Sequence, residues 1–425
     1  MVEEKVMLQV LEEQKVEMES YKSQQWISRK EESMFEFGSN LAQVVIGVRR
    51  SGKSTLCHKV LKEHKVKYAY ANLDDDRMAN MQTEDMNVLL SCIYQVYGTD
   101  IRYIFFDEIQ NVDGWHLLVN RLLRSNVCIF VTGSNAKLLS GELSTHLTGR
   151  YNEIRLYPFS FSEYCAYNKV NVDSITTKAD AERKQAFMEY VNEGGFPEMQ
   201  LLHNKRGYIQ SLLDAVLLKD IRQRFNVRDV DALRKIAYML ISNVCQTVNY
   251  GEMSKLLGMS DKTLKKYVGY LQQAFLIQLL PKFSYKSRER ITGEKAYIVD
   301  TGFENNRNNS MAGENLGRRL ENVVYIELLR RCSKNFQDVY YYKPTSRSKE
   351  VDFVVCTQNR VDELVQVAFD IEKPKVFDRE TSALLQASDA LHCDNLTLIT
   401  YASSSDVDVN GKTIHVYSAI DWLLL

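Results

Sequence analysis

The feature that most constrains this chain is a phosphate-loop motif near its amino end. Residues 47–54 read Gly-Val-Arg-Arg-Ser-Gly-Lys-Ser and fit the pattern G-x-x-x-x-G-K-[ST]. The motif follows the apolar run 44–46 and opens the helical run 55–62, so both parts of its usual context are present. Inward-turned N–H groups and the helix start favour a bound polyphosphate. The alternative is a glycine turn that matches by chance.

The residues of this motif have separate expected roles. We expect Lys53 to reach the β and γ phosphates, and Ser54 to bind Mg²⁺, which keeps other positions for water and phosphate oxygens. The expected nucleotide contacts are Gly47, Arg49, Ser51, Gly52, Lys53, Ser54, Thr55 and Asp107. The predicted ligands are therefore ATP and Mg²⁺.

A second acidic motif stands about fifty residues further on. Residues 103–108 read Tyr-Ile-Phe-Phe-Asp-Glu, an apolar strand that ends in two carboxylates. We expect Asp107 to join Ser54 in holding the metal, and Glu108 to orient or deprotonate the attacking water. An acidic strand end is by itself often only a polar end. Its pairing with the phosphate loop predicts hydrolysis beyond binding.

Two more polar positions extend the predicted site. The strand 128–132 ends in Gly133, Ser134 and Asn135, and Asn135 or Ser134 could sense the γ phosphate if this strand lies between the other two. Arg150 suits the stabilisation of charge on a transferring phosphoryl group, from the same chain or from a neighbour. A surface arginine is the alternative. The predicted catalytic residues are Lys53, Glu108, Asn135 and Arg150.

The order of elements predicts several domains. Short β-rich runs from residue 43 to 156 alternate with helical stretches, as a parallel sheet covered on both faces requires. The 425 residues also exceed one compact core. We expect a helical lead-in at 1–40, a phosphate-loop core at 41–157, a helical bridge at 158–240, a segment of short helices and a strand at 241–290, and an α/β domain at 291–425. In the lead-in, Met7, Val10, Leu11 and Trp26 have helical spacing.

Composition excludes several classes of protein. The 54 basic and 55 acidic side chains give a formal net charge of −1, so attraction to nucleic acid or an anionic membrane needs a local patch. The eight cysteines are scattered, with no C-x-x-C pair, which indicates reduced thiols rather than a zinc site. The amino end has no apolar leader and no run approaches a membrane span. We expect a soluble, cytoplasmic protein.

Several motifs together resemble a known family. The phosphate loop, Phe-Phe-Asp-Glu-Ile-Gln at 105–110, Thr-Gly-Ser-Asn at 132–135 and Leu-Thr-Gly-Arg-Tyr at 147–151 are similar to those of prokaryotic AAA-type ATPases that carry a C-terminal restriction-endonuclease-like domain. Pro-Phe-Ser-Phe-Ser-Glu-Tyr at 158–164, Gly-Gly-Phe-Pro-Glu at 194–198 and Tyr-Ile-Val-Asp-Thr-Gly-Phe at 297–303 extend the resemblance over nearly the whole chain. The resemblance implies an α/β fold with a parallel-sheet AAA-type ATPase domain, a helical and winged-helix middle, and an endonuclease-like α/β domain.

The middle segment carries a local basic patch. Between residues 249 and 290, eight Lys or Arg face three acidic residues, a balance of +5. Runs 253–257 and 262–273 outline a helix-turn-helix, in which Leu264, Val268 and Leu271 point inward. The lysines expected to face outward and contact DNA are Lys262, Lys265 and Lys266. Winged helices also serve as packing modules, which is the alternative.

The C-terminal domain is expected to lack a complete nuclease site. In the proteins that it resembles, an acidic residue, an Asp, and a Glu or Gln with a Lys two residues later hold a metal and activate water. The matching positions here are Glu321, Asp352 and Gln366, but Ala368 stands in place of the lysine. Residues that could supply the missing charge are Lys343, Lys349 and Arg379. We expect a fold used for binding, and a purely structural polar network is the alternative.

Two functions therefore remain open. The first is an Mg-dependent ATPase that acts as a conformational switch, on DNA and as a homo-oligomer. The second is an ATP-gated module that binds DNA or protein with negligible turnover. A metabolite kinase is less favoured, because the sequence shows no lid and no acceptor pocket.

Overall fold

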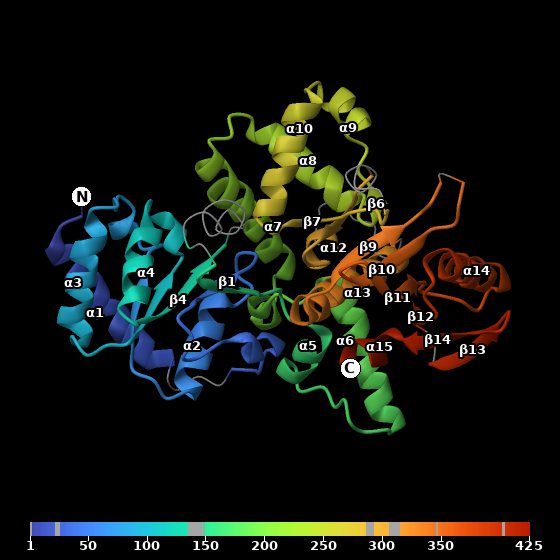
Figure 1. Cartoon of the computed structure of the whole chain (residues 1–425), viewed down its shortest axis with the longest axis horizontal. Coiled ribbons are helices and arrows are strands. Elements are labelled where there is room, and N and C mark those ends of the chain that lie inside the picture. Colours follow the sequence, from blue (N-terminus) through green and yellow to red (C-terminus); the bar gives the residue numbers. More distant parts are fainter. Residues whose placement is uncertain are drawn as a thin grey trace. The chain divides into compact units, whose positions relative to one another are not determined.

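The computed structural model divides the chain into two compact units, Met1–Leu156 and Tyr157–Leu425. Figure 1 draws their elements in sequence colours. The structure describes residues 2–21, 26–134, 147, 149–285, 293–305, 315–345, 347–401 and 404–425. Among these residues, no helix is both long enough and apolar enough to cross a membrane.

Unit 1 is built on a five-stranded sheet with the order β2-β3-β4-β1-β5. Its strands are β1 (Ala42–Ile46), β2 (Tyr68–Asn72), β3 (Tyr103–Asp107), β4 (Cys128–Gly133) and β5 (Tyr151–Arg155). Every pair is parallel, which confirms the expected parallel α/β sheet. Because β4 lies between β1 and β3, the carboxyl ends of these three strands meet at one edge of the sheet.

Helices flank this sheet. They are α1 (Glu4–Tyr21), α2 (Lys53–Glu63), α3 (Asp85–Tyr97) and α4 (Trp115–Arg124), with short 3-10 turns η1 (Lys30–Met34), η2 (Asp76–Met78) and η3 (Ile109–Asn111). The apolar face of α2, including Leu56 and Val60, packs on the sheet face that carries Val45, Phe105 and Phe130. Burial of such side chains is the main stabilising term for this unit.

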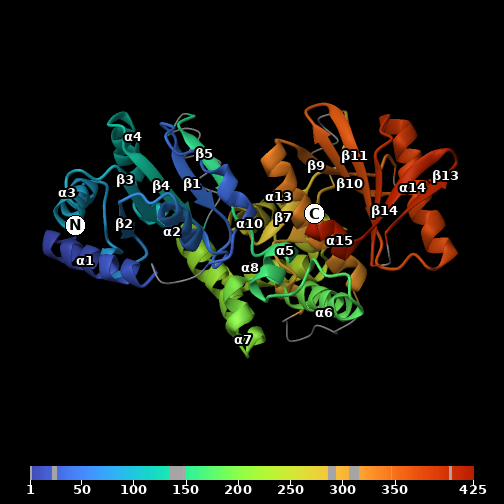
Figure 2. The ribbon, with the colours of Figure 1, turned by 90° about the horizontal axis from the view of Figure 1, so that it is seen from below.

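The segment predicted as a lead-in is part of unit 1. Helix α1 packs beside α3, as Figures 1 and 2 both show. Met7, Val10 and Leu11 are fully buried, as their spacing predicts. The side-chain amide of Gln14 bonds both the N–H and the carbonyl of Asn72, at 3.0 and 3.1 Å. The helix ends at Tyr21, so Trp26 lies beyond it.

Unit 2 begins with helices. They are α5 (Phe161–Tyr167), α6 (Thr177–Glu193), the 3-10 turn η5 (Pro197–Leu201), α7 (Lys205–Ala215), the π-helical η6 (Val216–Gln223) and α8 (Val230–Ser242). Ser160 caps α5, because its hydroxyl accepts from the N–H of Glu163, whose carboxylate accepts from the N–H of Ser160.

A motif between these helices has a structural explanation. The carboxylate of Asp300 accepts hydrogen bonds from the N–H groups of Gly195 (2.7 Å) and Gly302 (2.9 Å). A Cβ on Gly194 would lie 1.8 Å from Asp300 Oδ1, so this close approach requires glycine. Burial raises the pKa of Asp300 to about 6. The Gly-Gly-Phe-Pro and Val-Asp-Thr-Gly motifs therefore hold one another in place.

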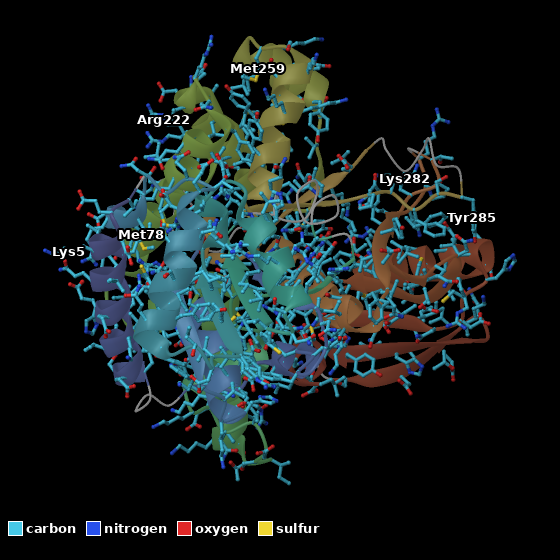
Figure 3. All side chains as sticks on the ribbon, turned by 60° about the vertical axis from the view of Figure 1, so that its left-hand side comes forward. Lys5, Met78, Arg222, Met259, Lys282 and Tyr285 are labelled. Atoms are coloured by element: carbon cyan, nitrogen blue, oxygen red, sulfur yellow. The ribbon has the colours of Figure 1, made fainter. Side chains whose placement is uncertain are left out.

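The middle of unit 2 combines three helices with a small sheet. The elements run α8, β6 (Gln246–Thr247), α9 (Tyr250–Leu257), α10 (Asp261–Gln273), β7 (Ile277–Leu280) and β8 (Lys295–Ile298), and the antiparallel sheet has the order β6-β8-β7. Leu264, Val268 and Leu271 are buried, as predicted. Because β8 pairs with β6 and β7, this segment extends past the expected boundary at residue 290. Figure 3 labels Met259 in the turn between α9 and α10, apart from Lys282 and Tyr285 on the segment after β7.

The last part of unit 2 contains a six-stranded mixed sheet with the order β13-β14-β12-β11-β10-β9. Its strands are β9 (Asp338–Tyr342), β10 (Val351–Thr357), β11 (Arg360–Val367), β12 (Leu396–Thr400), β13 (Ser405–Val409) and β14 (Lys412–Ser418). The helices of this part are α12 (Gly302–Asn305), α13 (Leu316–Asn335), α14 (Pro374–Leu391) and α15 (Ala419–Leu424). Helix α13 contacts both β8 and β10, so it joins the small sheet to the large one.

Candidate nucleotide-binding site

The phosphate loop lies between the end of β1 and the start of α2. A Cβ on Gly47 would lie 2.0 Å from the carbonyl oxygen of Leu156, so only glycine fits there. Gly52 precedes α2 with φ 97°, in the left-handed region that glycine adopts without strain. The backbone geometry therefore requires glycine at position 47 and favours it at position 52, and Lys53 and Ser54 lie in the first turn of α2.

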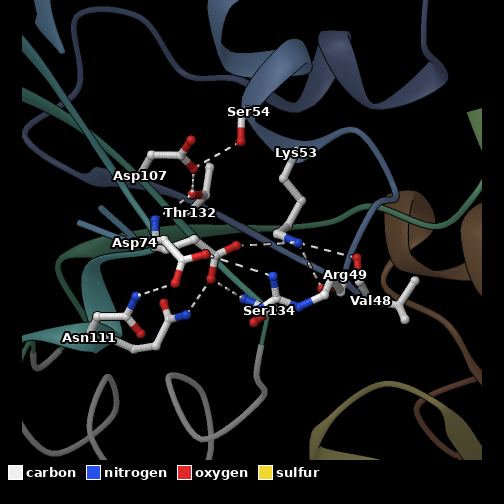
Figure 4. A network of polar contacts seen from close by, with 12 residues as sticks. Val48, Arg49, Lys53, Ser54, Asp74, Asp107, Asn111, Thr132 and Ser134 are labelled. Atoms are coloured by element: carbon white, nitrogen blue, oxygen red, sulfur yellow. Dashed lines mark hydrogen bonds and ion pairs between the residues drawn. The ribbon is translucent and has the colours of Figure 1, made fainter. Parts of the chain in front are cut away.

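The ammonium group of Lys53 is buried inside the loop. It donates to the carbonyls of Gly47 and Val48, each at 3.2 Å, and lies 3.8 Å from Glu108 Oε1 (Figure 4). Two of its three N–H groups thus contact neutral carbonyls, which compensate a buried charge less well than a carboxylate does. The lysine is placed to bind an anion.

Asp107 is the centre of the polar network at the end of β3. It accepts hydrogen bonds from Ser54 Oγ at 2.9 Å and from Thr132 Oγ1 (Figure 4). It also accepts one from Tyr70 Oη at 3.0 Å. These donors come from α2, β2 and β4. Together with β3, which carries Asp107, four elements therefore position one carboxylate. The structure brings together Ser54 and Asp107, the two predicted metal ligands.

Glu108 has a left-handed backbone with φ 52°, which is uncommon for a residue other than glycine. Its N–H donates to Thr132 Oγ1 at 3.0 Å. Its carboxylate accepts from the N–H of Ser134 at 3.3 Å and from the amide of Gln110. Left-handed residues of this kind concentrate at functional sites, and here the turn directs the carboxylate toward Lys53.

The two adjacent carboxylates differ in their pKa. Burial raises the pKa of Asp107, and the charge of Glu108 adds to this effect. Burial also acts to raise the pKa of Glu108, but the charge of Lys53 and the hydrogen bond from Gln110 outweigh it, so the pKa of Glu108 is lowered. Glu108 therefore keeps its negative charge more readily than Asp107 does.

The donors present fit a nucleotide with its magnesium ion. Mg²⁺ takes few protein ligands, and a hydroxyl with one carboxylate, as in Ser54 and Asp107, matches that preference. Ser51 Oγ is fully buried in the loop and has no hydrogen-bond partner among the described residues, so it can donate to an added anion. Arg49 lies 3.8 Å from Asp74, and Thr55 is exposed in the first turn of α2.

Arg150 lies at the opposite edge of the sheet. Its carbonyl accepts from the N–H of Ala42, at the start of β1, whereas the phosphate loop follows the end of that strand. A strand rises about 3.3 Å per residue, so the five residues of β1 separate the two by about 16 Å. Arg150 therefore does not reach the site of its own chain. Some predicted positions lie outside the described residues. They are Asn135, which was expected to sense the γ phosphate, and three members of the basic patch at 249–290, namely Lys286, Arg288 and Arg290.

The predicted nuclease positions lie in unit 2 where the sequence places them. Glu321 is on α13, Asp352 is on β10, and Gln366 is on β11. The position of the expected lysine is Ala368, and another lysine, Lys295 of β8, lies 3.3 Å from Glu321 and 3.8 Å from Asp352.

The three residues suggested to replace that lysine have other partners. Lys343 contacts Glu350 at 3.4 Å, Lys349 donates to Ser382, and Arg379 pairs with Glu380. The sequence offered one signal for Lys295, a single charge that opens the apolar strand Lys-Ala-Tyr-Ile-Val, and a buried charge requires a buried partner.

The predicted DNA contacts lie on one exposed face of α10. Lys262, Lys265 and Lys266 are all exposed. The ammonium of Lys265 lies 5.3 Å from the ring centre of Tyr250, and that of Lys266 lies 5.8 Å from the ring centre of Tyr270.

Comparison with known proteins agrees with this geometry. Residues 39–165 match the model of an AAA domain, and residues 184–310 match a domain of unknown function. The uncharacterized protein MJ1544 of Methanocaldococcus jannaschii is 32% identical over 375 residues, which cover 85% of this chain and 82% of that protein. An uncharacterized protein of Haemophilus influenzae is 34% identical over 406 residues, which cover 91% and 95%. Among solved structures, the Thermotoga maritima RuvB Holliday junction branch migration motor aligns with 17% identity and a TM-score of 0.29, over 56% of this chain and 82% of that one.

These matches cover both units, and the AAA match includes every described residue of the nucleotide site. The chain belongs to the family of these two uncharacterized proteins, and its amino-terminal part is an AAA-type P-loop domain.

Proposed function

We propose that this chain binds ATP together with Mg²⁺ and hydrolyses it, and that the nucleotide state acts as a conformational switch. One observation carries the proposal: the ends of β1 and β3 bring Ser54 Oγ within 2.9 Å of Asp107 and Lys53 Nζ within 3.8 Å of Glu108. These contacts support a site in which Lys53 binds phosphate, Ser54 and Asp107 bind the metal, and Glu108 is the base.

Each residue has a defined part in the reaction. Bound Mg²⁺ would be held by Ser54 and Asp107 and would neutralise charge on the phosphate oxygens. Lys53 binds the β and γ phosphates, with N–H groups of the loop around it. Glu108 takes a proton from water, whose oxygen bonds to the γ phosphorus while the bond to the β–γ bridging oxygen breaks. The products are ADP and inorganic phosphate.

The test is ATP binding and phosphate release by purified, nucleotide-free protein. We expect Glu108→Gln to keep its affinity for ATP and to lose about 100-fold or more in hydrolysis. Lys53→Ala should lose ATP affinity, and Glu84→Gln, an exposed glutamate, is the control that should behave like the unchanged protein. If the unchanged protein does not bind ATP with magnesium, the proposal fails. If it binds ATP but Glu108→Gln changes nothing, the chain is an ATP-gated binding module without turnover.

We further propose that Arg150 acts on the site of a neighbouring subunit in a homo-oligomer. The argument is its position about 16 Å from its own phosphate loop, at the amino edge of the sheet. Mixing inactive Arg150→Ala with inactive Lys53→Ala should restore part of the activity, because mixed assemblies contain sites with both residues. Absence of any recovery, or full activity of Arg150→Ala alone, removes this role.

A second candidate function is DNA binding through the segment 241–298. The order α8-β6-α9-α10-β7-β8 and the sheet order β6-β8-β7 support a winged-helix module, with α10 presenting Lys262, Lys265 and Lys266. Lysines contact phosphates rather than bases, so we expect duplex affinity that falls steeply with salt. Changing the three lysines to Gln should reduce the salt slope by about 3. Lys178→Gln, at a lysine with an 87% exposed side chain, is the control. Absence of DNA affinity at low salt contradicts this function.

We also propose that residues 316–425 have a restriction-endonuclease-like fold that does not cut DNA. The succession α13-β9-β10-β11-α14-β12 supports the fold, and Ala368 in place of the expected lysine supports the lack of cutting. Nicking of plasmid that depends on metal and is lost in Asp352→Ala would contradict it.

A further inference from the structure

Three carboxylates of unit 2 converge on one buried point. Glu321 reaches it from α13, Asp352 from β10, and Glu350 from the residue before β10. Carboxylates gathered in this way repel one another unless a cation lies between them. The question for this cluster is which cation neutralises it.

The chain supplies that cation itself. Lys295 enters from β8, and its Nζ lies 2.5 Å from Glu350 Oε1, 3.3 Å from Glu321 Oε1 and 3.8 Å from Asp352 Oδ1. Its side chain is 4% exposed. An ammonium group has three N–H donors, and here three carboxylates surround it.

Other protein donors also contact oxygens of the cluster. Tyr297 Oη donates to Glu321 Oε1 at 2.7 Å, the N–H of Val367 donates to Asp352 Oδ2 at 3.0 Å, and Lys343 lies 3.4 Å from Glu350 Oε2. A divalent ion would have to displace these donors and would lie beside a buried ammonium, with little water to screen the repulsion.

The amide of Gln366 is likewise turned away from a metal-binding role. Its oxygen accepts from the N–H of Asp352 at 3.3 Å, and its nitrogen donates to Glu380 at 2.8 Å. Gln366 therefore supports the backbone of β10 and does not offer its one ligand atom to the cluster. Among the described residues, no group of three His, Cys, Asp or Glu side chains is arranged to hold a metal ion.

We propose that the ammonium group of Lys295 occupies the cation position of the cluster formed by Glu321, Glu350 and Asp352, so that the chain's own lysine replaces a divalent metal ion there. The attraction of the carboxylates outweighs burial and raises the pKa of Lys295, so the group stays charged. The inference uses unit 2 alone and does not depend on ATP binding.

With the lysine in place, the three carboxylates are not arranged to hold a metal ion. A direct consequence is that removal of the lysine side chain allows them to close around one. The probe is Mn²⁺ alone, titrated calorimetrically into nucleotide-free full-length protein. Any binding near Ser54 and Asp107 is the same in every variant and is subtracted. We expect Lys295→Ala to gain one Mn²⁺ site that the unchanged protein lacks, and Lys295→Ala with Asp352→Asn to lose it again. Mn²⁺ should also raise the Tm of Lys295→Ala by about 5 °C, because only the folded chain holds the ion.

Two results would overturn the proposal. One is a folded Lys295→Ala protein, with an unchanged far-UV spectrum, that gains no Mn²⁺ site. The other needs no lysine variant and remains available if Lys295→Ala does not fold: the unchanged protein binds Mn²⁺ at a site that Asp352→Asn removes. Equal Mn²⁺ binding by the unchanged protein and Asp352→Asn supports the proposal. ATP binding by the same preparations reports on unit 1 separately.

Discussion

Two buried lysines of this chain lie next to carboxylates and have different surroundings. Lys53 of unit 1 contacts two backbone carbonyls at 3.2 Å and one carboxylate at 3.8 Å. Lys295 of unit 2 has three carboxylates within 3.8 Å. The first ammonium has charge left for an added anion, whereas the second is fully compensated by the protein.

The difference teaches that the residue types of a site do not determine its chemistry. Both clusters contain a lysine, two or more carboxylates and a tyrosine hydroxyl bonded to a carboxylate, from Tyr70 in unit 1 and from Tyr297 in unit 2. What differs is the ratio of acids to cations and the number of N–H groups left unused. The Ser51 hydroxyl has no hydrogen-bond partner among the described residues and can donate to a ligand, whereas Lys295 is surrounded by carboxylates of the chain itself.

The largest expected effect comes from removing each positive charge in turn. Lys295→Met should lower the unfolding free energy of unit 2 by about 3–5 kcal/mol at pH 8, because the buried Asp352 and the half-buried Glu321 then lose the cation that they share. Lys53→Met should change the stability of unit 1 by less than about 1 kcal/mol. The variant loses the contacts of the ammonium group but also no longer buries a charge that the protein compensates incompletely. Hydrogen exchange of the full chain measures both, from peptides of β10 and α13 and from peptides of β1 and α2.

The same experiment has a pH dependence with a definite sign. Burial and the charge of Glu321 raise the pKa of Asp352, so the folded state favours the protonated acid, and its contribution to stability is lost as pH rises through the folded pKa. The charge of Lys295 acts to lower the pKa of Asp352. Removing Lys295 therefore raises that pKa further and moves this loss of stability to higher pH. The destabilisation by Lys295→Met should therefore be smaller at pH 5 than at pH 8. An equal effect at both pH values would contradict the charge argument.

The sequence predicted which residues meet at the ends of β1 and β3 better than it predicted the acidic cluster, and for a physical reason. Gly47 to Ser54 are contiguous, and Asp107 ends a strand that must be parallel to β1, so local pattern and strand direction suffice to place them. Tyr70 and Lys295 were missed because their partners lie 37 and 57 residues away, in pairings that only the three-dimensional fold defines. The sequence placed Glu321, Asp352 and Gln366 on the right elements, but it did not predict that Lys295 lies beside them.

An intermediate effect is expected at Thr132, which has no counterpart in the cluster of unit 2. Its hydroxyl donates to Asp107 and accepts from the N–H of Glu108, so one side chain links both carboxylates. Thr132→Val keeps the shape but removes the acceptor of the Glu108 N–H, which costs about 1–3 kcal/mol. Hydrolysis should fall about 10-fold, because 1.4 kcal/mol of lost positioning corresponds to that factor.

The control for this change is Thr132→Ser, which retains the hydroxyl and should hydrolyse ATP at close to the unchanged rate. If the valine and serine variants behave alike in steady-state phosphate release, Thr132 does not position the carboxylates.

The smallest effect is expected at Tyr70, and it reports on the charge state of Asp107. The hydrogen bond from Tyr70 acts to lower the pKa of Asp107, against the burial that raises it. Tyr70→Phe should therefore raise this pKa and move the acid limb of hydrolysis to higher pH by roughly half a pH unit, since one such bond contributes about 1 kcal/mol. On the alkaline side of the acid limb, where the rate of hydrolysis no longer rises with pH, the rates of the two proteins should agree within about twofold. Tyr97→Phe is the matched control, because that buried hydroxyl bonds the carbonyl of Tyr70 and no carboxylate. A pH profile that shifts equally in both variants would mean that the loss of packing, rather than the bond to Asp107, causes the change.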